Sequence, residues 1–197
     1  MSKVEELVER ARRLKEKGLT TGEIADELNV SRETALWLLT KAKEGATPPS
    51  DIYIDWKRVS TVSRRLRLLA EIMADMILEA GEVEVVVGVA TSGIPVSTLV
   101  AELLDAELSI YFPKKLKWEK DATHISGAFS ENYAKVDGKR CVIVDDVITS
   151  GSTIEETVEH IRRRDGSVLC AAVIVDKRGM DELSGIPILS LFRIVRI

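Results

Sequence analysis

The sequence predicts an α/β fold, an open and mostly parallel sheet flanked by helices, preceded by a small domain made only of helices. From Val83 onward, short apolar runs alternate with amphipathic segments, which is typical of parallel strands joined by crossover helices. Before that, three short segments carry apolar residues at helical spacing. Two consecutive prolines, Pro48 and Pro49, separate the two patterns. We therefore expect a helical domain at 1–45, a linker with an extended segment at 46–56, and the α/β domain at 57–197.

The composition is that of a soluble globular protein. The 197 residues are 45% hydrophobic and 30% charged, and the net charge is −4. Such a charge neither requires nor excludes a polyanionic partner, because local patches decide that. No apolar run approaches the roughly 18 residues needed to span a bilayer. Cys141 and Cys170 adjoin apolar runs and lack the spacing of metal ligands. We expect a cytoplasmic protein with buried, reduced thiols and no membrane association.

The first 45 residues predict three helices. Apolar residues at positions 4, 7, 8, 11 and 14 form one face of a helix that ends at Gly18. Thr20 and Glu23, three residues apart before the next apolar face, form the pattern of a capping box and predict a second helix. Ser31 is expected to cap a third helix that continues to about Lys43.

The second and third of these helices resemble the helix-turn-helix of DNA-binding regulators. Its packing positions are matched by Ile24, Ala25, Leu28, Val30, Ala35 and Leu38. The turn of that motif bends into the left-handed region and usually holds Gly. This chain has Asn29 there, a residue that tolerates the same conformation. The resemblance implies that outward residues near the start of the last helix contact base edges. These are Ser31, Arg32, Glu33, Leu36, Trp37, Thr40 and Lys41.

Charge leaves a second interpretation of this domain open. The first 45 residues hold nine Lys and Arg and nine Asp and Glu, whereas a DNA-binding module usually has a basic excess. Three short helices with apolar faces also build dimerisation caps and other protein-interaction modules. In such a module, Leu36 and Trp37 would be buried against another surface. DNA binding is therefore predicted from the spacing of the motif and not from its charge.

The α/β part begins with a long amphipathic helix, expected at 64–80, that covers one face of the sheet. Buried strands are expected at 83–90, 107–112, 141–145, 167–175 and 186–192, with helices at 95–104 and 154–164 between them. The segment after the second strand holds four lysines and shows little periodicity, which is typical of an exposed loop. These alternations together predict the parallel sheet.

The stretch 141–153 is the most informative one. An apolar run ends in Asp145 and Asp146, and five small residues then lead into a helix: Thr149, Ser150, Gly151, Ser152 and Thr153. Main-chain N–H groups of small residues at a helix N-terminus suit a phosphate, and two adjacent carboxylates accept hydrogen bonds from the vicinal hydroxyls of a ribose. The stretch lacks the ending of a P-loop and the glycine pattern of a dinucleotide site. It predicts a ribose 5-phosphate site, with an ordinary strand, turn and capped helix as the structural alternative.

This stretch resembles the phosphoribosyl-pyrophosphate (PRPP) signature of the type I phosphoribosyltransferases and matches it at every position. The resemblance implies the fold of that family, with the two acids on the ribose hydroxyls, the small loop on the 5-phosphate, and Mg²⁺ bound together with PRPP. It also implies a pyrophosphate loop at Thr91, Ser92 and Gly93, for which a tight strand-to-helix turn without a ligand is the structural alternative. A basic loop is implied at Lys114, Lys115 and Lys117.

Two positions depart from the orotate enzymes of that family. Those enzymes follow the aspartate at the position of Asp176 with an arginine that reads the pyrimidine carboxylate. This chain has Lys177, which meets an anion in the base pocket without a bidentate fork. His124 is not followed by the glycine of the orotate pattern, and we interpret it as an ordinary polar residue. No catalytic residue is assigned.

The whole chain resembles the orotate-phosphoribosyltransferase-like transcription regulators of archaea, in which a helix-turn-helix is joined to this fold. The resemblance implies a homodimer that binds DNA and takes PRPP, or a related nucleotide or purine, as its effector. The alternative is an active phosphoribosyltransferase that acts on orotate or a purine base with PRPP and Mg²⁺. A third possibility, an N-terminal module that binds protein instead of DNA, is supported by its neutral charge.

Overall fold

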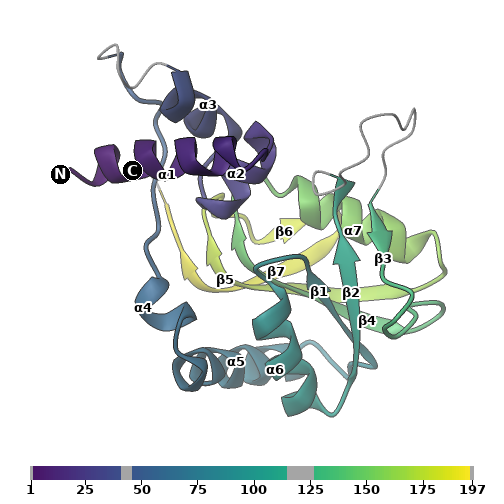
Figure 1. The fold of residues 1–197 in the computed structure, drawn as a ribbon. Helices are drawn as coiled ribbons and strands as arrows, with labels where there is room; N and C mark the ends of the chain where they lie inside the picture. The colour runs from purple at the N-terminus through teal and green to yellow at the C-terminus, as the bar shows by residue number, and fades with distance from the viewer. Residues whose placement is uncertain (1, 41–45, 115–126, 196–197) are drawn as a thin grey trace. The chain divides into compact units, whose positions relative to one another are not determined.

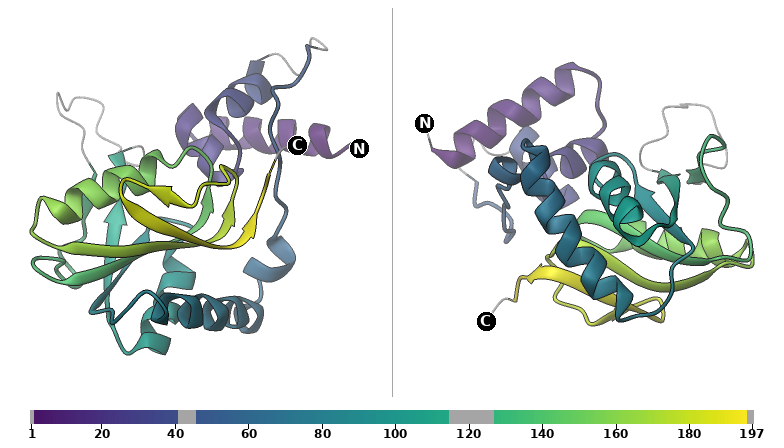
Figure 2. Two further views of the ribbon diagram at one scale, coloured as in Figure 1. Left: turned by 180° about the vertical axis from the view of Figure 1, so that it is seen from behind. Right: turned by 90° about the horizontal axis from the view of Figure 1, so that it is seen from below.

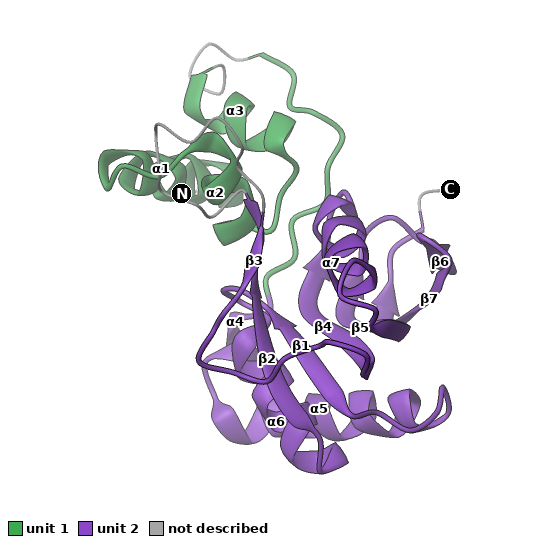
Figure 3. Ribbon diagram, turned by 90° about the vertical axis from the view of Figure 1, so that its right-hand side faces the viewer, with its two compact units in different colours: residues 1–55 green, residues 56–197 purple. Residues whose placement is uncertain are grey.

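The computed structural model describes residues 2–40, 46–114 and 127–195. The chain divides into two compact units, Met1–Asp55 and Trp56–Ile197 (Figure 3). The first unit, called the head below, includes all but the last residue of the segment expected as a linker. None of the described helices is both long and apolar enough to cross a bilayer.

The described residues of the head form three helices, α1 (Lys3–Glu16), α2 (Thr21–Glu27) and α3 (Arg32–Thr40) (Figure 1). The capping box predicted at Thr20 and Glu23 is present. Asn29 has a φ of 52°, so the left-handed turn predicted between the last two helices is confirmed. The six predicted packing residues are all buried, and they share one core with Leu7, Val8 and Ala11 of α1.

The second unit is built on a sheet whose strands run in the order β3-β2-β1-β4-β5-β7-β6. The strands are β1 (Val85–Val89), β2 (Glu107–Phe112), β3 (Ala128–Phe129), β4 (Arg140–Ile148), β5 (Ser167–Asp176), β6 (Glu182–Leu183) and β7 (Ile186–Arg193). The five long strands pair in parallel, while β3 and β6 pair antiparallel at the two edges. The mostly parallel sheet predicted from the alternating pattern is therefore confirmed.

Helices cover both faces of this sheet. The short α4 (Lys57–Ser60) leads into α5 (Ser63–Leu78), which packs with α6 (Ile94–Leu104) on one face, and α7 (Ser152–Arg162) lies on the other face (Figures 1 and 2). Apolar side chains of β1, β4 and β5 meet Ile154, Val158 and Ile161 of α7 in a single core. All five residues of β1 are buried, as expected for a strand covered on both faces.

Three details differ from the sequence predictions. Strand β4 does not stop at the paired acids but continues to Ile148, because β5 pairs with it up to Asp176. The segment after Trp56 forms α4, which was not predicted because four residues carry too little periodicity. The edge strands β3 and β6 were missed for the same reason, since each has only two residues.

Both cysteines are buried in the sheet, as predicted. Burial raises the pKa of the Cys141 thiol and of the Cys170 thiol to about 12, so almost no thiolate forms near neutral pH. We expect neither thiol to react with a thiol-specific disulfide reagent at pH 8 in the native protein, and both to react once denaturant is added. Counting released chromophore in the two conditions checks this, and a rapidly reacting native thiol would contradict it.

Candidate functional site

The predicted site lies where the carboxyl ends of three neighbouring strands meet. Strands β1 and β4 are paired up to Gly88 and Val144, and β4 and β5 are paired up to Ile148 and Asp176. The loops that follow these strands therefore leave the sheet at the same edge. In open α/β sheets, ligands bind at this edge, where strand order reverses between neighbouring crossovers. Here β2 and β4 flank β1 on opposite sides.

Asp145 and Asp146 lie in β4, near its carboxyl end at Ile148. Asp146 is buried, with 5% of its surface exposed, whereas Asp145 is half-buried. The N–H of Asp146 donates to Asp145 Oδ1 at 2.8 Å, and the N–H of Val147 donates to Asp146 Oδ1 at 2.9 Å. Each carboxylate is thus held by the main chain through one oxygen. This fixes their orientation, as two acceptors for a pair of ribose hydroxyls require.

The five small residues form a tight turn into α7. Gly151 is the N-cap residue, with a φ of 83°, and no side chain caps the helix. Ser150 and Ser152 are exposed, and their hydroxyl oxygens lie 2.9 Å apart. An uncapped helix N-terminus leaves main-chain N–H groups and the positive end of the helix dipole to bind an anion. The geometry fits the predicted phosphate loop.

The predicted pyrophosphate loop lies directly beside the paired acids. Thr91 and Ser92 are exposed, Gly93 is buried, and α6 begins immediately afterwards. A Cβ atom placed on Gly93 would lie 2.9 Å from Asp145 Oδ1 and 2.7 Å from the carbonyl oxygen of Val89. Only a residue without a side chain permits this approach. The structure therefore brings together two loops that are more than fifty residues apart in the sequence.

Arg178 is a site residue that sequence reasoning missed. Its guanidinium donates from Nη1 to the carbonyl oxygen of Ser150 at 2.7 Å and so supports the phosphate loop from the segment that follows β5. The buried Asp176 carboxylate accepts N–H groups of Arg178, Gly179 and Met180, which folds the chain back after β5. The neighbouring Lys177, predicted for the base pocket, donates its N–H to the carbonyl of Ile148 at the end of β4.

Glu156 of α7 joins the helix of the phosphate loop to the start and end of the basic segment. Its Oε1 accepts the N–H of Gly127 at 2.8 Å and the N–H of Lys114 at 3.2 Å. Burial, followed by the charge and hydrogen bond of Glu156, raises the pKa of Tyr111 far above its usual range. The hydroxyl of Tyr111 lies 3.1 Å from Nδ1 of His160, whose pKa is lowered by burial. Lys115, Lys117 and His124 lie outside the described residues.

Replacing Glu156 by alanine should lower the free energy of unfolding of the second unit by about 1–3 kcal/mol, because two main-chain N–H groups lose this acceptor and Gly127 is buried. Glu156→Gln keeps an acceptor oxygen and should cost less. The control is Glu159→Ala, which removes an exposed ion pair with Arg163 and should change stability by less than about 0.5 kcal/mol. Denaturant titration of the three variants checks the order, and equal stabilities would contradict the role given to Glu156.

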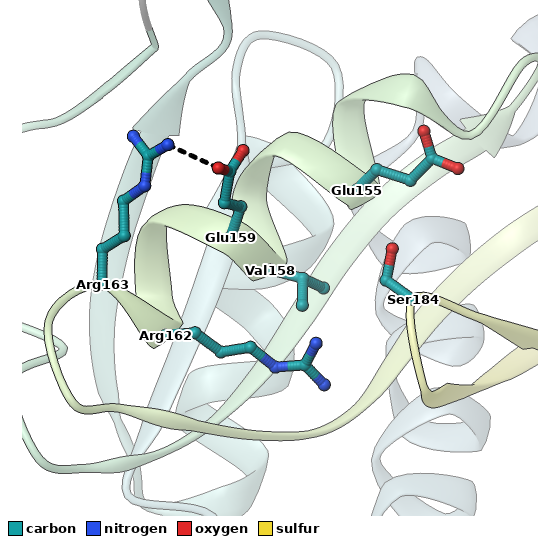
Figure 4. A pocket seen from close by; sticks show the side chains of 6 residues that line it. All are labelled: Glu155, Val158, Glu159, Arg162, Arg163 and Ser184. Atoms are coloured by element: carbon teal, nitrogen blue, oxygen red, sulfur yellow. Dashed lines mark hydrogen bonds and ion pairs between the residues drawn. The ribbon is translucent and has the colours of Figure 1, made fainter.

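A separate recess of about 390 Å³ lies between α7 and the turn that joins β6 and β7 (Figure 4). It is lined by Glu155, Val158, Glu159, Arg162, Arg163 and Ser184. Acidic and basic side chains are equally numerous there, and Glu159 pairs with Arg163 at 2.5 Å. None of the residues predicted to bind PRPP lines this recess, so it is distinct from the site at the sheet edge.

In the described part of the chain, no three His, Cys, Asp or Glu side chains are placed so that they could hold a metal ion. Asp145, whose Oδ1 adjoins Gly93, and Asp146 are the carboxylates that precede the phosphate loop. This donor set fits a Mg²⁺ ion that is bound mainly by the phosphates of a ligand, since Mg²⁺ usually takes only one or two carboxylates in addition to such phosphates and water.

The predicted DNA face of α3 is exposed in part. Arg32, Glu33, Leu36 and Thr40 are exposed along one side of the helix, and Leu36 is 53% exposed. Trp37 instead packs against the head core and donates from Nε1 to the carbonyl of Ala46 at 3.2 Å. Ser31 caps the helix, its Oγ accepting the N–H of Thr34 at 3.1 Å. Lys41 lies outside the described residues.

Residues 55–195 match the family model described as the phosphoribosyl transferase domain. The chain is 57% identical to the transcriptional regulator GfcR of Archaeoglobus fulgidus, with all of both chains covered. It is 41% identical to GfcR of Haloferax volcanii, with 100% of this chain and 99% of that relative covered.

Among solved structures, orotate phosphoribosyltransferase from Aeropyrum pernix superposes with a TM-score of 0.55 at 27% identity, over 76% of this chain and 82% of that one. Adenine phosphoribosyltransferase from Rhodothermus marinus gives a TM-score of 0.59 at 24% identity, over 75% and 89% of the two chains. The second likeness shows the fold alone.

Proposed function

The chain belongs to the GfcR transcriptional regulators, which carry a phosphoribosyl transferase domain, and on this premise we propose that PRPP or a related nucleotide is the effector that controls its binding to DNA. The observation that carries the proposal is the arrangement at the sheet edge. Two oriented carboxylates lie between an uncapped helix N-terminus and a glycine loop. This arrangement suits a ribose that carries a phosphate at one end and a pyrophosphate at the other.

In this proposal the residues have separate roles. Asp145 and Asp146 accept the 2- and 3-hydroxyls of the ribose, and the main chain of Thr149–Thr153 binds the 5-phosphate. Thr91–Gly93 bind the pyrophosphate, and the oxygens of the pyrophosphate also bind the Mg²⁺ ion. Lys177, which follows β5, is the residue proposed to contact the base. Lys114, Lys115 and Lys117 would add positive charge near the pyrophosphate.

The head binds DNA through the exposed side of α3, on which Arg32, Glu33, Leu36 and Thr40 gather. Ser31 and Trp37 hold that helix in place, Ser31 by capping it and Trp37 by its hydrogen bond to Ala46, so they affect DNA binding through its position. Lys41 is proposed as a further DNA-contacting residue. We propose a homodimer as the DNA-binding form, because a two-fold protein reads two half-sites with two copies of one helix.

The test uses a duplex selected by the protein itself from a random pool, since the operator is unknown. Its dissociation constant is measured by fluorescence anisotropy at physiological salt, with and without PRPP and Mg²⁺. We expect a change of about 5- to 150-fold, the usual range of an allosteric coupling. A ligand acts this way only if it prefers one of two states of the protein. Equal dissociation constants, or no specific duplex, would refute the proposal.

An enzymatic function is the second candidate, since the same arrangement holds what transfer of a ribosyl group requires: a bound ribose and a bound pyrophosphate leaving group. The observation in its favour is that both loops and both acids meet at one edge. Pyrophosphate release is measured over a panel that contains orotate and purine bases. Steady turnover with one base would show that the protein is an enzyme as well as a regulator.

A further inference from the structure

Helix α3 of the head begins differently from α1 and α2. In α1 and α2, the N-cap residue and the glutamate three residues later exchange hydrogen bonds, so both capping boxes are completed locally. The N–H of Ser2 donates to Glu5 at 2.6 Å, and the N–H of Thr20 donates to Glu23 at 2.6 Å. In α3 the residue three positions after the cap is Thr34, which has no carboxylate.

The missing acceptor comes from a distant part of the chain. The N–H of Ser31 donates to Asp51 Oδ2 at 2.7 Å, twenty residues later, and Asp51 Oδ1 accepts the N–H of Ile52 at 2.7 Å. Asp51 therefore takes, at the start of α3, the place that Glu5 and Glu23 take at the other two helices. Among the three head helices, this is the one that carries the predicted DNA-contacting residues.

The segment around Asp51 is held along the head by further contacts. Trp37 donates to the carbonyl of Ala46 at 3.2 Å, and Arg10 donates to the hydroxyl of Tyr53 at 3.0 Å. Tyr53 also packs against the head core. The segment 46–55, called the strap below, is thus held against the head. Its last residue directly precedes Trp56, the first residue of the second unit.

We infer that Asp51 is a positioning residue through which the strap conveys ligand binding in the second unit to the start of the DNA-contacting helix. This inference rests on the proposed function and names its route. A displacement of the strap weakens the Asp51–Ser31 hydrogen bond and changes how firmly the first turn of α3 is held. A ligand that prefers one of these arrangements then changes DNA affinity, as reciprocal linkage requires.

The test separates capping from signal transmission. Asp51→Ala removes the link, while the double variant D51A/T34E supplies a local capping box like those of α1 and α2 and restores the charge of the head. We expect the double variant to fold, to bind PRPP as the wild type does and to bind the selected duplex. The effect of PRPP on its dissociation constant should fall below about twofold, from at least fivefold in the wild type. Glu27→Ala, which removes an exposed charge from α2, should keep the full effect.

The possible outcomes distinguish failure of the inference from failure of the proposed function. If D51A/T34E retains the full PRPP effect, Asp51 is only a helix cap and the inference is wrong, while the proposed function stands. If the wild type itself shows no PRPP effect, the proposed function and the inference fail together. A measurement without variants guards against poor folding: amide hydrogen exchange of Ser31 in the wild type should change at least about threefold when PRPP is added. Unchanged exchange would overturn the inference.

Discussion

Replacing Asp145 and Asp146 together by asparagine weakens PRPP binding by at least about 100-fold. Each carboxylate is predicted to accept a hydrogen bond from a ribose hydroxyl, and hydrogen bonds to charged groups contribute about 1.5–3 kcal/mol each. Two of them correspond to about 3–6 kcal/mol, and each 1.4 kcal/mol is a factor of ten in affinity. Isothermal titration calorimetry with PRPP and Mg²⁺ measures this loss directly.

The fold should survive this change. Each of the two residues accepts a main-chain N–H through one oxygen, and the amide oxygen of asparagine retains that acceptor. A matched control is Asp105→Asn. Asp105 is exposed, ends α6 in the left-handed region at a φ of 51°, and precedes β2 at the opposite edge of the sheet. Asparagine tolerates that conformation, so the control should bind PRPP with unchanged affinity. Undiminished binding by the double variant would remove the paired acids from the site.

The strand, turn and helix that form the centre of this candidate site were predictable because they follow one another in the sequence. A strand, two acids, a turn of small residues and a helix are adjacent at 141–162, and the local patterns of such elements survive folding. Asn29 is a similar case in the head. A turn between two closely spaced helices requires a left-handed residue, and Asn29 tolerates that conformation.

The residues that sequence reasoning missed act across long distances. Arg178 reaches Ser150 only because β5 pairs with β4 in a register that no local pattern specifies. Glu156 lies in a helix that the sequence predicts, but its contacts with Lys114 and Gly127 depend on where the chain returns after β2. One signal was available for Asp51. Ser31 caps α3, but the residue three positions later is Thr34 and not the glutamate of a capping box. A missing local acceptor indicates one supplied from elsewhere.

Gly93→Ala tests whether the loop at Thr91–Gly93 and the paired acids approach each other as closely as the structure indicates. The φ of Gly93 is −73°, so alanine introduces no backbone strain by itself. The added Cβ would instead lie 2.7 Å from the carbonyl oxygen of Val89 and 3.0 Å from that of Val144. Both atoms belong to the main chain of the central strands and cannot turn away. Overpacking of this kind costs about 1–3 kcal/mol of stability.

The same methyl group would lie 2.9 Å from Asp145 Oδ1 and push that carboxylate out of place. PRPP affinity should therefore fall by about tenfold or more, since at least one hydrogen bond to a charged group is weakened. Gly22→Ala is the control: its Cβ would find no atom nearer than 3.9 Å, and its place in α2 favours alanine by up to about 1 kcal/mol. Denaturant titration and calorimetry on both variants should give opposite signs for stability and a loss of PRPP binding only for Gly93→Ala. If both variants bind PRPP equally well, the loop at Thr91–Gly93 does not adjoin the ribose site.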